Sequence, residues 1–180
     1  MFKLYLESTL LKYLFIIYLI FFFSFFIRAE SNQNIGKLNL PDGFQISIFA
    51  DKLESPRQIT ETKEGYVIVG SKKGDKIFAL FDGDHDGYAE TKLIIATGLK
   101  NPTGVTYHKG DLYFAEVEDI WIIKNIDDWI LSGKTELPPV ESYLSGLPSE
   151  TWHGFRHLRF GPDENLYIPI GAPCNVSIEP

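Results

Sequence analysis

A short run near the end of the chain brings together side chains that can move protons and bind anions. From His153 to Asp163 it reads HGFRHLRFGPD, with two histidines and two arginines, and it continues as ENLYIPIG. A histidine with its ordinary pKa of about 6.5 can accept a proton at neutral pH. An arginine can bind a carboxylate through two parallel hydrogen bonds. The run could therefore hold a general base beside an anionic ligand. The alternative is that a histidine in a loop beside Trp152 only packs there.

A second candidate site lies where Asp82, Asp84 and Asp86 alternate along the run DGDHDG. Alternating carboxylates followed by glycine match the first half of an EF-hand calcium loop. The second half departs from that pattern, because Leu93 stands at the position that requires a bidentate glutamate. Glu90 could partly substitute for it. Two interpretations stay open, a weak calcium site and an acidic turn between two strands.

An internal repeat predicts the scaffold that must position these residues. The segment ADKLESP at 50–56 returns in modified form as ATGLKNP at 96–102. After the same interval, KEGY at 63–66 is matched by KGDL at 109–112, and a third copy includes ENLY at 164–167. A repeat with a period in this range is typical of stacked structural units.

Each copy of the repeat contains four short segments with the composition of strands. In the first copy they are RQITE, YVIVGS, KIFALF and KLIIATGL, separated by the turn sequences KEG, KKGD and DGDHDG. A short helical turn near Ile126–Trp129 is the expected exception. Tandem four-stranded units predict an all-β fold, a β-propeller, because one blade cannot bury both of its faces alone.

The length of the chain predicts an incomplete propeller. Residues 40–180 provide about three blades, and the third breaks off after its second strand begins. Because a propeller needs at least four blades to close, we expect an N-terminal part of a longer protein. Residues 30–39 are expected to form a linker ahead of it.

The first 29 residues differ in kind from the rest. The apolar run YLFIIYLIFFFSFFI at 13–27 follows Lys3 and Lys12, a pattern typical of a secretory signal peptide. The run is shorter than the roughly 20 residues of a membrane span. We therefore expect residues 1–29 to be a signal peptide and the protein to be periplasmic or secreted, without stable membrane insertion after cleavage. An uncleaved N-terminal anchor is the alternative.

Composition narrows the partners further. The formal net charge is −7, which disfavours binding to nucleic acid, because neutralisation of phosphates supplies most of such affinity. The single cysteine, Cys174, excludes an internal disulfide and a zinc site made of several thiolates.

Taken together, the motifs resemble one known family. The run H-x-x-x-x-L-x-F-G-P-D-x-x-L-Y-x-x-x-G, from His153 to Gly171, is similar to the soluble glucose/sorbosone dehydrogenases. The sequences SPR at 55–57, NPTG at 101–104 and GAPCNV at 171–176 resemble the sorbosone dehydrogenase branch. The resemblance extends from about residue 40 to the end of the chain. Members are six-bladed propellers that oxidise sugars with pyrroloquinoline quinone (PQQ) and calcium.

The resemblance implies roles for individual residues. It implies that His153 is the general base that removes a hydroxyl proton while a hydride passes to PQQ. His157 is expected to be structural. Arg57 and Arg156 are candidate partners for the carboxylates of PQQ, with surface salt bridges as the alternative for each. The carbonyl ligands of the PQQ-bound calcium would come from later blades, so the chain alone is expected to be inactive.

The family implies a substrate class and an electron acceptor. An aldose, sorbosone-like or related hydroxyl or aldehyde compound would be oxidised, and a c-type cytochrome or a quinone would take the electrons. The competing hypothesis is a non-catalytic propeller that binds carbohydrate or a protein partner, because the fold alone is compatible with either function.

Overall fold

The computed structural model describes residues 35–172 and divides them between two units. The described part of the first unit, residues 35–47, contains the 3₁₀ helix η1 (Ile35–Lys37). The second unit begins at Ile48 and contains the strands. The predicted signal peptide, the first half of the predicted linker (residues 30–34) and Cys174 lie outside the described residues. None of the helices within 35–172 is long and apolar enough to cross a membrane.

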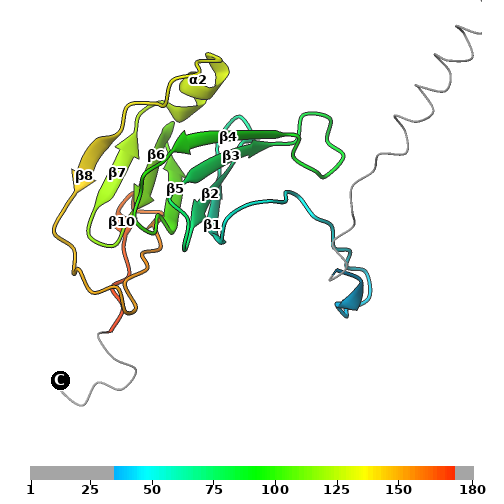
Figure 1. Cartoon of the computed structure of the whole chain (residues 1–180), viewed down its shortest axis with the longest axis horizontal. Helices are drawn as coiled ribbons and strands as arrows, with labels where there is room; N and C mark the ends of the chain where they lie inside the picture. The colour runs from blue at the N-terminus through cyan, green and yellow to red at the C-terminus, as the bar shows by residue number, and fades with distance from the viewer. Residues whose placement is uncertain (1–34, 173–180) are drawn as a thin grey trace, which may run out of the picture. The chain divides into compact units, whose positions relative to one another are not determined.

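Two four-stranded antiparallel sheets form the body of the second unit (Figure 1). The first has the order β1 (Pro56–Glu61), β2 (Val67–Ser71), β3 (Ile77–Phe81), β4 (Thr91–Ala96). The second has the order β5 (Gly104–His108), β6 (Asp111–Ala115), β7 (Ile120–Ile123), β8 (Glu141–Leu144). Neighbouring strands in each sheet are consecutive in the chain, which is the arrangement predicted for a propeller blade.

A third sheet and one α-helix complete the described elements. Strands β9 (Arg159–Phe160) and β10 (Leu166–Tyr167) pair antiparallel and begin a third blade. Helix α2 (Ile126–Leu131) follows β7 at the place where the sequence predicted a helical turn. The described residues are therefore all-β apart from this helix and η1, and they form part of a β-propeller.

The strands of the second blade carry apolar side chains on both faces. This allows the second blade to pack against the first blade on one face and the third blade on the other. Along β6, Leu112 and Phe114 point into a core shared with the first blade. The alternate residues Tyr113 and Ala115 point into a core shared with Leu158 and the third blade. Side chains alternate between the faces of a strand, so the continuous run in β6 fills two cores rather than one.

The first strands of the blades, β1, β5 and β9, lie together at one edge of the sheets, and Gln58 of β1 connects them. Its side-chain oxygen accepts hydrogen bonds from the backbone N–H groups of Val105 and Leu158, each at 3.3 Å. Its side-chain nitrogen donates to the Leu158 carbonyl at 2.9 Å. One amide therefore satisfies backbone groups of the second and third blades at once.

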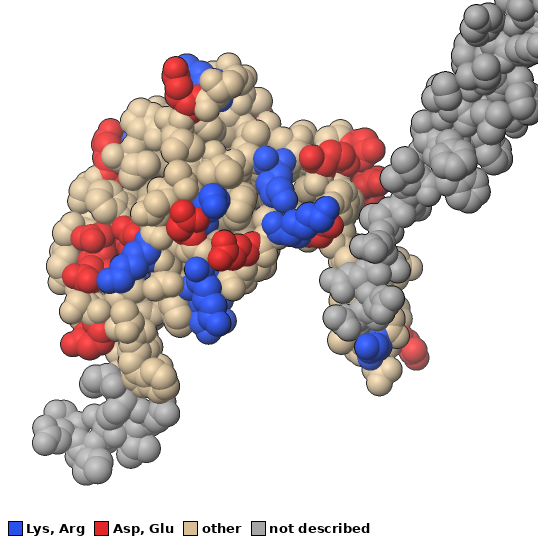
Figure 2. Space-filling model, viewed as in Figure 1, with Lys and Arg blue, Asp and Glu red and all other residues tan. Residues whose placement is uncertain are grey.

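On the face drawn in Figure 2, lysine and arginine side chains lie among aspartates and glutamates rather than in a continuous basic patch. Ion pairs such as Lys124–Asp111, at 2.8 Å, also bring opposite charges together. The absence of a nucleic-acid partner stays a prediction.

The role of Gln58 leads to a first prediction. Replacing Gln58 by Ala removes three hydrogen bonds and leaves the facing backbone groups of Val105 and Leu158 without them. Because each bond contributes about 1 kcal/mol net, urea denaturation should show a loss of about 2 to 3 kcal/mol. Glu61→Ala, an exposed position on the same strand, is the control and should change stability by less than about 0.5 kcal/mol. Equal losses in both variants would remove Gln58 from this role.

Candidate functional site

A cavity of about 240 Å³ lies where the chain enters the third blade. It is lined by Pro148, Glu150, Trp152, His153, Gly154, Arg156, Ile170 and Gly171. Two residues that the sequence singled out, His153 and Arg156, are thus brought to one cavity. Arg57 and the acidic loop do not line it.

The imidazole of His153 is held by the backbone of the segment that follows β10. Its Nδ1 lies 3.0 Å from the carbonyl oxygen of Ala172. A carbonyl oxygen only accepts hydrogen bonds, so Nδ1 carries the hydrogen and Nε2 of the neutral ring is left as a proton acceptor. His153 is exposed. It is therefore accessible, oriented and in the tautomer that a general base requires.

The backbone turn at His153 has counterparts ahead of the other two blades. His153 has φ 58°, in the left-handed region that non-glycine residues rarely adopt. Ser55 and Asn101, each immediately before a proline, have φ 46° and 52°. A left-handed residue thus precedes the first strand of every described blade, and the third blade places a histidine there.

The position of His153 depends on the absence of a side chain at Gly171. A Cβ atom built on Gly171 would lie 2.4 Å from the His153 carbonyl oxygen and 2.7 Å from its Cβ. Both contacts are shorter than side chains tolerate, and neither atom belongs to a flexible chain end. Glycine is therefore required for the segment after β10 to pass beside His153.

A substitution at Gly171 tests this close approach. Gly171→Ala should force His153 and the segment at 171–172 apart and break the Nδ1–Ala172 hydrogen bond. The change should lower stability by about 1 to 3 kcal/mol and shift the imidazole nitrogen NMR signals of His153 away from the Nδ1–H tautomer. Gly36→Ala is the control, since nothing lies within 4 Å of a Cβ there. An unchanged His153 spectrum in Gly171→Ala would contradict the assigned geometry.

Arg156 is buried at the other side of the cavity, with 1% of its surface exposed. Its Nε–H donates to the Val117 carbonyl at 3.0 Å, and Nη2 donates to the Pro148 carbonyl at 2.6 Å. Among the described residues no carboxylate lies within 4.0 Å of it. Among the described residues Arg156 is therefore buried and forms no salt bridge, and its predicted contact with a PQQ carboxylate stays a prediction.

Two other residues named in the sequence lie outside the cavity lining. Arg57 is exposed near the start of β1, and its proposed contact with PQQ stays a prediction. His157 is exposed as well, and its predicted structural role is likewise untested. The sequence did not predict that the Ala172 carbonyl would contact His153 or that Glu150 would line the cavity. The GAPCNV motif was the only signal near Ala172, and no sequence pattern marked Glu150.

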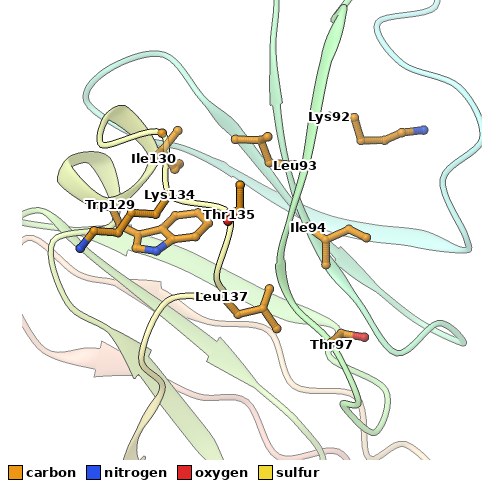
Figure 3. A pocket seen from close by; sticks show the side chains of 10 residues that line it. Lys92, Leu93, Ile94, Thr97, Trp129, Ile130, Lys134, Thr135 and Leu137 are labelled. Atoms are coloured by element: carbon orange, nitrogen blue, oxygen red, sulfur yellow. The ribbon is translucent and has the colours of Figure 1, made fainter.

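A larger groove of about 670 Å³ lies between β4 and the segment that follows α2. Figure 3 shows the Trp129 indole from α2 on one side and Leu93 and Ile94 from β4 on the other. Leu137 extends the apolar lining, which contains no carboxylate or imidazole. Its chemistry suits binding rather than proton transfer.

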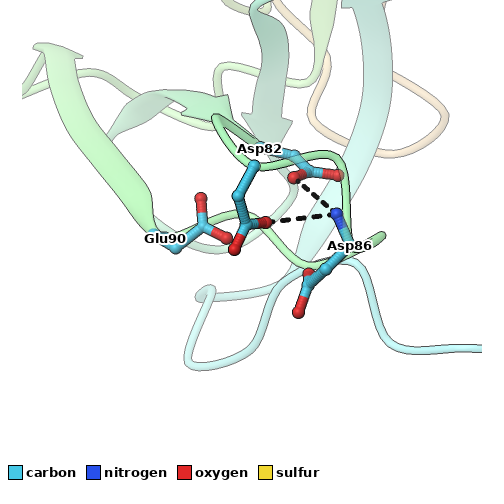
Figure 4. A group of neighbouring side chains, drawn as sticks. Asp82, Asp86 and Glu90 are labelled. Carbon is cyan, nitrogen blue, oxygen red and sulfur yellow. Dashed lines mark hydrogen bonds between the residues drawn. The ribbon is translucent and has the colours of Figure 1, made fainter.

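The acidic loop gathers its carboxylates around one point (Figure 4). One oxygen each of Asp82, Asp84, Asp86 and Glu90 lies within 4.8 Å of the others. The Asp86 N–H donates to Oδ1 of Asp82 at 3.2 Å and of Asp84 at 3.1 Å, and the Gly83 N–H donates to Glu90 Oε2 at 3.1 Å. The substitution of Glu90 for the missing glutamate is thus sterically feasible.

The clustered negative charges affect the protonation of Asp84. The Asp86 backbone N–H lowers the pKa of Asp84, but desolvation and the carboxylates of Glu90 and Asp86 outweigh it, so the pKa is raised. A raised pKa means that the ionised form is disfavoured in the folded loop. A divalent cation would relieve that repulsion.

Calcium titration decides between the two interpretations of this loop. About 5 mM Ca²⁺ should raise the melting temperature by about 2 to 5 °C, because a cation that binds only the folded state stabilises it. The shift should shrink as the pH falls through the raised pKa of Asp84, since a protonated carboxyl is a poor ligand. An Asp82→Asn/Asp84→Asn variant should show no shift. If Mg²⁺ acted as well as Ca²⁺, or if the double variant responded like the native chain, the loop would be only an acidic turn.

Comparison with known proteins places this arrangement in context. No family model matches the chain. An uncharacterised protein of Borreliella burgdorferi is 28% identical over 165 residues, which cover 86% of this chain and 41% of that protein.

Solved structures show the fold. The PQQ domain of pyranose dehydrogenase from Coprinopsis cinerea matches with a TM-score of 0.66 at 14% identity, over 78% of this chain and 33% of that one. A calcium structure of a Trichoderma reesei carbohydrate-active enzyme of family AA12 matches with 0.63 at 18% identity, over 75% and 34%. A protein from Thermus thermophilus described as a "putative oxidoreductase (glucose dehydrogenase)" matches with 0.53 at 17% identity, over 72% and 40%.

The chain shares its β-propeller fold with these proteins, one of which is the PQQ domain of pyranose dehydrogenase. It spans 41% of the curated relative and between 33% and 40% of these solved chains. The similarity shows the propeller fold and does not establish the activity of a complete protein.

Proposed function

We propose that this chain is part of an exported PQQ-dependent dehydrogenase of the sorbosone dehydrogenase branch. Its substrate would be an aldose, sorbosone-like or related hydroxyl or aldehyde compound. The observation that carries the proposal is the cavity at the start of the third blade. There an accessible imidazole lines the same cavity as a buried guanidinium that no carboxylate among the described residues neutralises.

His153 would act as the general base. Oxidation of a hydroxyl group to a carbonyl removes a proton from oxygen and a hydride from carbon. Nε2 of His153 takes the proton, and the Ala172 carbonyl, already bound to Nδ1–H, stabilises the resulting imidazolium. Because the backbone at 171–172 fixes the ring, no reorientation is needed at the moment of transfer.

The side chains at the cavity fit the proposed cofactor. PQQ accepts the hydride when bound and carries three carboxylates. Arg156 offers a charge that no described carboxylate neutralises and that two backbone carbonyls hold in place. A bound carboxylate would compensate this buried charge, which is the natural role of a guanidinium. Arg57 is a second candidate partner, and further contacts and the calcium ligands would come from later blades.

Other parts of the proposal rest on the sequence. The apolar run at 13–27 supports export to the periplasm or beyond, and a c-type cytochrome or a quinone is the proposed electron acceptor. Since most of the cofactor pocket would lie in further blades, the 180-residue chain is proposed to be inactive alone.

Substitution of the two histidines tests the catalytic assignment. In the full-length gene product with PQQ and calcium, His153→Ala should lower kcat for sugar oxidation by about 10² to 10⁴, the usual cost of losing a general base. PQQ binding, followed by its absorbance, should persist. His157→Ala is the matched control and should act mainly on stability. If His153→Ala oxidised sugar at the native rate, the histidine would be only a packed residue.

The groove of Figure 3 favours a second candidate, a propeller that binds carbohydrate or a protein partner without catalysis. The two functions predict different outcomes with the same sample. An absence of both turnover and PQQ absorbance changes over a sugar panel, together with ligand binding lost in Trp129→Ala, would favour the binding module.

A further inference from the structure

The three tryptophans of the chain differ in what surrounds them. Trp121 packs against the core between the first two blades, and its Nε1–H donates to Glu116 at 2.8 Å. Trp129 packs against the same core. Trp152 is 62% exposed, takes no part in the described cores and lines the cavity that contains His153. Its indole therefore has a large apolar face that the described residues leave uncovered.

The position of the Trp152 ring is nevertheless well defined. It stacks on the His153 imidazole with ring centroids 5.1 Å apart and an interplanar angle of 21°. That separation is typical of an offset stack, so the imidazole covers only part of the indole face. His153 is itself bound to the Ala172 carbonyl. The loop behind both rings is tight, since a Cβ on Gly154 would lie 2.2 Å from the Glu150 carbonyl oxygen.

The groups around the cavity fit a particular ligand chemistry. A flat apolar surface beside a carboxylate and an imidazole suits a ring that has C–H groups on its faces and hydroxyl groups at its rim. A pyranose has this construction, whereas an open-chain polyol presents no flat apolar face. Glu150 is one of the lining residues, and its negative charge near the cavity would disfavour an anionic sugar.

We propose that Trp152 is the platform on which a neutral pyranose ring stacks beside His153, with Glu150 accepting a hydrogen bond from a ring hydroxyl. The inference rests on the proposed function in one respect: it takes His153 to be the base that removes the proton from the nearest sugar hydroxyl. Stacking on Trp152 positions the substrate and sets its specificity. It does not move a proton.

The test uses the full-length gene product and two readouts. Without PQQ, D-glucose or D-xylose should change the tryptophan fluorescence, whereas D-glucitol and D-glucuronate should not. Trp152→Ala should abolish the change and Trp152→Phe should weaken its spectral signal but keep sugar affinity by calorimetry. Trp121→Phe is the matched control, because Trp121 lines neither the cavity nor the groove beside β4, and it should respond like the native protein.

The second readout separates this inference from the proposed function. With PQQ and calcium, Trp152→Ala should raise KM for the pyranose about five- to tenfold and leave kcat within about twofold, as loss of a binding contact does. Trp152→Phe should recover most of the affinity. Sugar-dependent fluorescence without turnover by any sample would support the platform and refute the proposed oxidation. Turnover with a native KM in Trp152→Ala, or no fluorescence response to any pyranose, would overturn the platform.

Discussion

The need of each blade to bury two apolar faces governs this structure. Apolar side chains cover both faces of the four-stranded sheets, as Leu112 and Tyr113 on opposite faces of β6 illustrate. Each sheet must therefore pack between two neighbours. Packing sheets side by side brings their first strands together at one edge, where Gln58 bonds to backbone groups of the next two blades. His153 and Arg156 lie in the segment that leads into β9, the first strand of the third blade.

That constraint explains why the cavity residues come from separate segments. The left-handed turn before the third blade presents His153, and the segment after β10 returns beside it because Gly171 has no side chain. Arg156 is buried because the carbonyls of Val117 and Pro148, from the second blade and its connection to the third, enclose its guanidinium. The contacts between blades therefore also set the positions of His153 and Arg156 at the proposed site.

Local features were predictable from the sequence, and contacts between blades were not. The run YVIVGS predicted β2 (Val67–Ser71) because strand-forming residues are bounded by turn residues. The spacing of the acidic loop left a weak calcium site and a plain acidic turn both open, and the carboxylates lie close together in the structure. Arg57 and Arg156 stand at similar places in the repeat, yet one is exposed and the other buried. The difference arises from neighbouring blades, which no single-segment pattern reports. The Ala172 carbonyl depends likewise on a close approach between distant residues.

The general base and the cofactor are proposed to meet at the cavity before the third blade. The decisive measurement is a structure of the full-length gene product with PQQ and calcium bound. We expect a PQQ carboxylate within hydrogen-bond distance of the Arg156 guanidinium, and Nε2 of His153 facing the reactive side of the cofactor. PQQ bound at another place, His153 turned away from it, or a protein that takes up no PQQ would contradict this meeting of base and cofactor.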